Sequence, residues 1–187
     1  MINLHDNFSG GWSDGPGVCG ISSEDQYINA DANDIITMLS HLEPLFEDKL
    51  LVNEAGCGDL FWLRNHHAFF ETYVDYHGYE LQKREIHENC LNLAWTRLDI
   101  CNQVMRSCDV VLSRLVFIHL SNKMILQALN LFRETGAKYL IASHYNTRHN
   151  ENRHISPSYV GLGYNLSEAP FDLKLIRAVG QTATFEL

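Results

Sequence analysis

A strand, a glycine turn and the start of a helix follow one another between Leu50 and Leu63. The apolar run at the start of this stretch predicts a buried strand, with Glu54 at its end. Gly56 and Gly58 then permit a tight turn, in which the backbone can approach a ligand without a Cβ in the way. Asp59 precedes an apolar-periodic segment, as a helix N-cap does. This layout is typical of a nucleotide-type cofactor site, although two glycines also suit a purely structural turn.

Strands and helices alternate along the rest of the chain, which implies a parallel sheet with right-handed crossovers. Helices are expected at 23–46, from Asp59 onward, at 82–92 and at 121–135. Strands are expected at 50–54, 73–79, 93–98, 109–113, 138–143, 172–179 and 182–187. The last two strands flank Gly180-Gln181 and read as a hairpin. We therefore expect an α/β fold with a mostly parallel seven-stranded sheet and an antiparallel strand in the C-terminal hairpin.

The length of 187 residues fits one domain, 1–187, which we divide into an N-terminal arm (1–22), a helix (23–46), the sheet and a long polar loop (144–170). The 14 basic and 23 acidic side chains give a formal net charge of −9, which disfavours a nucleic-acid partner. Five scattered cysteines form no C-x-x-C pair, so neither a disulfide framework nor a metal site is expected. Because no secretory signal and no apolar run of membrane-spanning length is seen, we expect a cytoplasmic protein.

Four segments at predicted strand ends carry a resemblance to a known family. They are Glu54-Ala-Gly-Cys-Gly-Asp59, the acidic Glu80, Leu98-Asp99-Ile100, and Ser113-Arg-Leu-Val-Phe-Ile-His-Leu-Ser121. In this order they resemble the class I S-adenosylmethionine-dependent methyltransferases, most closely small bacterial-type enzymes. The resemblance covers residues 31–187 and implies a Rossmann-like fold.

The resemblance also implies a role for residues along the carboxyl edge of the sheet, where S-adenosyl-L-methionine would bind. The glycine turn would meet the methionyl portion, Glu80 the ribose, and Asp99 with Ile100 the adenine, while Arg114 and Leu115 would lie beside the transferring methyl. The full cofactor-binding set is Glu54, Gly56, Cys57, Gly58, Glu80, Leu81, Asp99, Ile100, Arg114 and Leu115. Two of these depart from the family, which usually has Asp at the positions of Glu54 and Leu115.

Methyl transfer by in-line displacement needs a positioned nucleophile and, in some cases, a base to remove its proton. We nominate His119, His144 and Tyr145 as candidate catalytic residues. A histidine on an apolar segment is, however, more often a hydrogen-bonded residue of the core than a catalytic base, and His119 fits that role too. Neither an Asn-Pro-Pro-Tyr motif nor a Pro-Cys nucleophile follows the fourth strand, which disfavours amino methylation of DNA and covalent pyrimidine methylation.

The acceptor is expected to enter over the N-terminal arm and the loop 144–170, since long irregular loops are usually functional or disordered. The arginines and histidines of this loop suit an anionic or aromatic molecule, and they suit a solvated surface equally well. Three functions stay open. They are methylation of a small molecule or peptide side chain, methylation of RNA or another macromolecule, and binding or cleavage of S-adenosylmethionine without methyl transfer.

Overall fold

A computed structural model describes residues 25–81, 92–147, 150 and 163–187. Seven strands form one sheet in the order β3-β2-β1-β4-β5-β7-β6. The strands are β1 (Leu50–Ala55), β2 (Val74–Glu80), β3 (Ala94–Arg97), β4 (Val110–Ser113), β5 (Tyr139–Ser143), β6 (Lys174–Val179) and β7 (Thr182–Glu186). Only β7 runs antiparallel to its neighbours, β5 and β6, so the predicted parallel sheet with an antiparallel strand from the C-terminal hairpin is confirmed.

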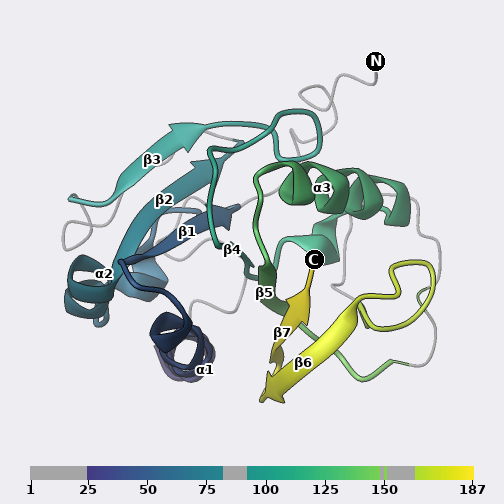
Figure 1. Ribbon diagram of the computed structural model, residues 1–187. Coiled ribbons are helices and arrows are strands. Elements are labelled where there is room, and N and C mark those ends of the chain that lie inside the picture. The colour runs from purple at the N-terminus through teal and green to yellow at the C-terminus, as the bar shows by residue number, and fades with distance from the viewer. Residues whose placement is uncertain (1–24, 82–91, 148–149, 151–162) are drawn as a thin grey trace.

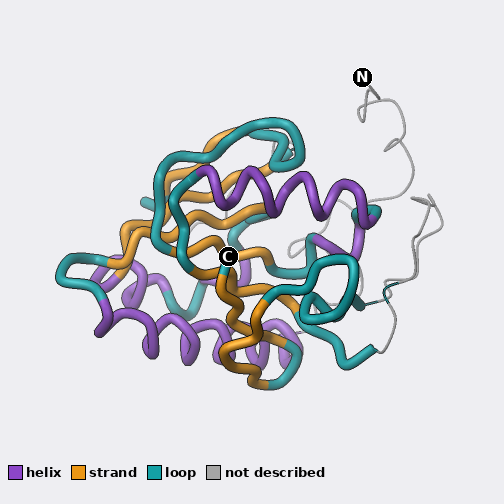
Figure 2. The backbone as a smooth tube through the Cα atoms, turned by 45° about the vertical axis from the view of Figure 1, so that its right-hand side comes forward, coloured by secondary structure: helices purple, strands orange, loops and turns teal. Residues whose placement is uncertain are grey.

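Helices cover both faces of the sheet (Figure 1). The helices α1 (Asp25–Leu42) and α2 (His67–Tyr73) lie on one face, and α3 (Asn122–Glu134) lies on the other. Figure 2 shows the strands between these two helical layers. Each face has its own apolar cluster, with Met38 and Phe70 in the first and Leu129 and Phe132 in the second. Along β4 the clusters alternate residue by residue, as the pleat of a strand requires.

The helix predicted at 121–135 is confirmed. Ser121 caps α3, because its side chain accepts a hydrogen bond from the Met124 backbone N–H. The helix ends before Gly136, which adopts a left-handed φ of +83°. The first helix is confirmed, but it is shorter than the predicted range 23–46: α1 ends at Leu42, and a 3₁₀ turn containing Pro44 follows it.

The helix predicted to start at Asp59 is wrong. Leu60 has a left-handed φ of 63°, which a helix cannot contain, and the Asp59 side chain accepts from the Phe61 backbone N–H two residues on. A 3₁₀ turn (Phe61–Leu63) follows, and α2 begins only at His67. Two of the apolar residues that suggested a helix, Trp62 and Leu63, are instead buried in the same apolar cluster as Cys57 of the glycine turn.

The predicted helix 82–92 falls almost wholly on residues outside the described part of the chain, as do the arm 1–22 and much of the loop 144–170. Between β3 and β4, the described residues form turns without a helix. The segment is fastened instead by Asn53 of β1, whose amide donates to the Arg106 carbonyl over 2.7 Å. Within the described ranges, none of the helices combines the length and apolar character that crossing a membrane would require.

Candidate functional site

The carboxyl ends of β1, β2, β4 and β5 meet at one edge of the sheet, because these four strands are parallel neighbours. The glycine turn follows β1, Glu80 ends β2, Arg114 and Leu115 follow β4, and His144 and Tyr145 follow β5. In open parallel sheets, ligands bind outside this edge. The structure thus brings together most of the segments that the sequence nominates, on four neighbouring strands.

The glycine turn is bonded to the end of β2. The backbone N–H groups of Gly56 and Cys57 both donate to the Tyr79 carbonyl, over 2.8 and 3.0 Å. The Gly58 N–H donates to the Glu80 carboxylate over 3.0 Å. One side chain at the end of β2 therefore fixes the turn and stands at the open edge, where we expect the ribose.

The two glycines of the turn serve different purposes. A Cβ on Gly56 would lie 2.4 Å from Cγ2 of Val116, so Gly56 makes room for the segment after β4. A Cβ on Gly58 would meet no described atom within 4 Å, although its φ of +61° is left-handed. The open space is therefore at Gly58. Cys57 is buried, and its sulfur lies 2.7 Å from the position that a Cβ on Gly78 would take. Glycine at position 78 therefore makes room for the Cys57 side chain.

Glu54 is completely buried within β1 instead of standing at the open edge. Its carboxyl group accepts from the Trp62 indole N–H over 3.0 Å and from the Tyr76 hydroxyl. Burial raises the pKa of Glu54 to about 8, against the opposing effects of Tyr76, Arg114 and Trp62. The side chain is therefore mainly protonated at neutral pH.

The sequence did not reveal which residues donate hydrogen bonds to Glu54. Trp62 and Tyr76 both contact the ring of Phe70 edge-on, with centroid distances of 5.8 and 5.4 Å, so the acid lies inside an aromatic cluster. The N–H of a buried tryptophan usually finds a hydrogen-bond acceptor. This rule could have predicted an acceptor for Trp62, although it does not identify Glu54.

The adenine candidates lie in a tight turn after β3. Asp99 accepts from the Cys101 backbone N–H over 2.9 Å and from the Asn102 side-chain amide over 2.7 Å. Ile100 is buried in the cluster on the α3 face. Both oxygens of Asp99 thus have a partner in the turn, and contact with adenine stays a prediction for Asp99 and Ile100. Leu81 follows Glu80 and accepts through its carbonyl from Arg97.

The segment after β4 is held in an unusual backbone conformation. Leu115 has a φ of 54°, which β-carbon sterics disfavour, and its N–H donates to the Ser143 hydroxyl over 2.9 Å. Residues held in this region often mark functional sites. Within the described residues, the buried hydroxyl of Ser113 has no hydrogen-bond partner. The ends of β4 and β5 are therefore joined to each other and carry an unsatisfied polar atom.

The candidate bases lie on two loops that Tyr164 connects. Its hydroxyl donates to the Leu120 carbonyl, next to His119, and its carbonyl accepts from the Tyr145 N–H. Burial lowers the pKa of His119 and of His144, so both imidazoles are neutral at pH 7 and can accept a proton. The Tyr145 ring packs against Gly163, at which a Cβ would lie 1.8 Å from the ring.

His144 lies against β7, the last strand along the chain. Its ring packs edge-on against Phe185 with a centroid distance of 5.7 Å. Its Nδ1 is enclosed, with no hydrogen-bond partner in the part of the chain described. A role as base stays a prediction for all three residues. Among the described residues, no group of three or more Cys, His, Asp or Glu side chains could hold a metal ion.

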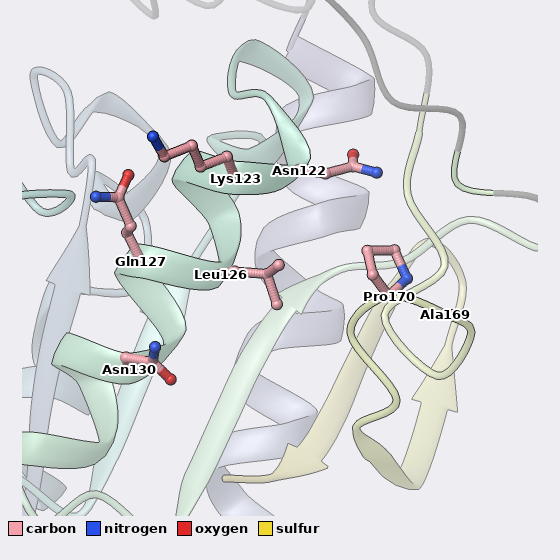
Figure 3. A pocket seen from close by; sticks show the side chains of 7 residues that line it. All are labelled: Asn122, Lys123, Leu126, Gln127, Asn130, Ala169 and Pro170. Carbon is pink, nitrogen blue, oxygen red and sulfur yellow. The ribbon is translucent and has the colours of Figure 1, made fainter. Parts of the chain in front are cut away.

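A shallow groove of about 660 Å³ lies elsewhere, between the outer side of α3 and Ala169-Pro170 (Figure 3). Polar side chains and one exposed leucine line it: Asn122, Lys123, Leu126, Gln127 and Asn130. None of the residues nominated for the carboxyl edge contributes to it.

No family model matches this chain, and no curated protein matches its sequence. Solved structures do match its fold. Magnesium protoporphyrin IX methyltransferase (ChlM) from Synechocystis PCC 6803 with bound SAM has a TM-score of 0.60 and 15% identity, over 92% of this chain and 85% of that chain. The DhpI–SAH complex has a TM-score of 0.61 and 12% identity, over 88% and 87%.

The N-methyltransferase NodS from Bradyrhizobium japonicum WM9 has a TM-score of 0.54 and 12% identity, over 82% of this chain and 94% of that chain. Similarity at this level of identity concerns the fold. The strand order, the single antiparallel strand and the helical layers on both faces agree with it. The protein therefore has the fold of the class I S-adenosylmethionine-dependent methyltransferases.

Proposed function

We propose that the protein is an S-adenosylmethionine-dependent methyltransferase that acts on a small molecule or a peptide side chain. The observation that carries the proposal is the bond between the Gly58 N–H and the Glu80 carboxylate at the carboxyl edge of the sheet. It joins the glycine turn to the acidic end of β2, the two features that a nucleoside-type cofactor needs side by side.

Three observations fit this cofactor. A Cβ at Gly58 would meet no described atom within 4 Å, which leaves room for a ligand there. Glu80 offers carboxylate oxygens that can accept hydrogen bonds from ribose hydroxyls. The buried Ser113 hydroxyl, which lacks a partner within the described residues, lies where β4 reaches the edge. When bound, the cofactor supplies a methyl group whose bond to the sulfonium sulfur breaks as an acceptor nucleophile bonds to the carbon.

The chain's own part in the reaction is to position the acceptor and to take its proton. His119 is the favoured base, because it is neutral at pH 7 and follows the strained segment at Leu115. The nominated acceptor site is formed by the N-terminal arm and the loop 144–170, most of which lie outside the described residues. A small acceptor is favoured by the acidic net charge of −9 and by similar structures such as the magnesium protoporphyrin IX enzyme.

The test is transfer of labelled methyl groups. The full chain is incubated with S-adenosylmethionine labelled in the methyl group, together with pools of small molecules, peptides or RNA. We expect label in one small-molecule or peptide pool and formation of S-adenosylhomocysteine in equal amount. The matched control is Gly58→Val, which should show neither. Label in the RNA pool alone would favour a macromolecular acceptor, and breakdown of the cofactor without any pool would identify a cleaving enzyme.

A further inference from the structure

A buried acid contacts the edge of one tryptophan, and a cation lies over the face of the same ring. Trp62 donates its indole N–H to Glu54, and the guanidinium carbon of Arg114 lies 5.6 Å from the centroid of the Trp62 ring. Trp62 is 1% exposed, so its ring is fixed by packing. The orientation of the ring therefore links the position of the Glu54 carboxyl group to that of the Arg114 guanidinium.

A second contact ties the same two segments together. Gly56, two residues after Glu54, leaves the space that Val116 fills, two residues after Arg114. In addition, β1 and β4 are paired, with Glu54 opposite Leu112. Arg114 is thus held beside the glycine turn by strand pairing, by packing of Val116 and by the face of Trp62.

Rigid placement of a guanidinium at this edge suits a carboxylate ligand. Arginine presents five N–H donors in a planar fork that matches a carboxylate, so it can bind one in addition to its contacts with the chain. Under the proposed function, on which this inference rests, the ligand's methionyl portion carries such a carboxylate. A protonated Glu54 carries no charge that competes with the ligand for Arg114, whereas an ionised Glu54 would compete with it.

We propose that Arg114 binds the carboxylate of the cofactor's methionyl portion and that Glu54, acting through Trp62, is the positioning residue for this guanidinium. Besides Arg114, the titratable groups that act on Glu54 are the Tyr76 hydroxyl and the Glu80 carboxylate of β2, and the Cys57 thiol lies in the adjoining turn. None of these can substitute for Arg114 as a cation.

The arrangement predicts how affinity depends on pH. A bound carboxylate disfavours ionisation of Glu54, so binding takes place preferentially with the acid protonated. Affinity is then constant below the Glu54 pKa of about 8 and falls above it, by at most about tenfold per pH unit. Without the Glu54 carboxyl group, this fall disappears.

The first experiment is calorimetric titration of the full chain with S-adenosylhomocysteine between pH 6.5 and 9.5, for the wild type and for Glu54→Gln. The amino group of the ligand titrates equally against both proteins, so the difference between the profiles isolates Glu54. We expect the affinity of the wild type to fall more steeply above pH 8. Parallel profiles would overturn the role of Glu54.

Tyr76→Phe provides an independent variant if Glu54→Gln does not fold. The Tyr76 hydroxyl lowers the pKa of Glu54, so its removal raises that pKa. The fall in affinity should then begin at a higher pH than in the wild type. An unchanged onset would contradict the proposed coupling.

The second experiment asks whether Arg114 recognises the carboxylate. Decarboxylated S-adenosylmethionine lacks only this group, and the wild type should bind it about tenfold or more weakly than S-adenosylmethionine. In Arg114→Met the two ligands should bind equally, and in Arg114→Lys an intermediate ratio should remain. Equal binding of both ligands by the wild type would overturn the inference alone. Failure of the wild type to bind either ligand would overturn the proposed function as well.

Discussion

The Glu80 carboxylate accepts a hydrogen bond from the Gly58 N–H, and it lies at the position where we expect the ribose. Glu80→Ala should weaken S-adenosylmethionine binding about tenfold or more, since charge-assisted hydrogen bonds contribute roughly 1.5–3 kcal/mol. Glu80→Gln is the matched control, because its amide oxygen can still accept from Gly58. Calorimetry on both variants checks the prediction. Wild-type affinity in a folded Glu80→Ala protein would rule out the assignment.

The two glycines of the turn should respond differently to substitution. Gly56→Ala should lower the free energy of unfolding by more than the roughly 1–2 kcal/mol of a left-handed residue, because its Cβ also meets Val116. Gly58→Val meets only the backbone cost, so it should stay folded and lose ligand binding. Urea unfolding and calorimetry separate the two effects. Recovery of stability in Gly56→Ala with Val116→Ala would support the contact, whereas normal binding by Gly58→Val would make the turn purely structural.

At the scale of single residues, the sequence predicted where a residue lies along the fold better than it predicted the surroundings of its side chain. Gly58 and Glu80 lie where their spacing predicts, at the ends of two neighbouring strands. Glu54 lies in the predicted strand, yet its side chain is buried, because Trp62 and Tyr76 offer two donors to its carboxyl group. Those partners lie 8 and 22 residues away, beyond the reach of a local pattern.

Among the elements, the segment between β3 and β4 has one of its polar contacts with the sheet at Asn53. Asn53 is fully buried, donates to the Arg106 carbonyl and accepts from the Arg106 guanidinium over 3.3 Å. Asn53→Ala should lower the free energy of unfolding by about 1–3 kcal/mol, because buried groups lose their partners. Lys174→Ala, at an exposed ion pair with Glu186, is the control and should leave the unfolding midpoint unchanged. Equal midpoints for both variants would contradict the importance of this contact.

Element types were predictable where a clear period or a cap was present, as in α3. The failure after Asp59 has a definite cause. The apolar residues there occur at helical spacing, but Leu60 adopts a left-handed backbone conformation. The chain then forms a 3₁₀ turn, which buries Trp62. Tertiary burial therefore overrides the local pattern directly after the glycine turn.

For the whole molecule, the mostly parallel sheet and the antiparallel strand of the C-terminal hairpin were predictable from the alternation of strands and helices, whereas the order of the strands was not predicted. One buried acid should contribute a downward slope to the way stability depends on pH. Between the ordinary Glu pKa of 4.5 and about 8, the native state keeps a proton on Glu54 that the unfolded state releases. Stability contributed by this group therefore falls as pH rises through that window, by up to about 1.4 kcal/mol per unit, and is level above it.

Urea unfolding at a series of pH values, with Glu54→Gln as the comparison, checks this prediction. The amide cannot ionise and can still accept from Trp62 or Tyr76, so the variant should lose the downward slope and exceed the wild type in stability near pH 8. Parallel stability profiles would mean that Glu54 ionises normally in the folded protein.

The central claim is that the carboxyl edge of the sheet binds S-adenosylmethionine through the glycine turn and Glu80. Calorimetric titration of the full chain with S-adenosylmethionine, repeated with Gly58→Val, tests it most directly. We predict saturable binding of one molecule per chain to the wild type and no binding to the folded variant. Absence of binding to the wild type, or equal binding to both proteins, would contradict the claim.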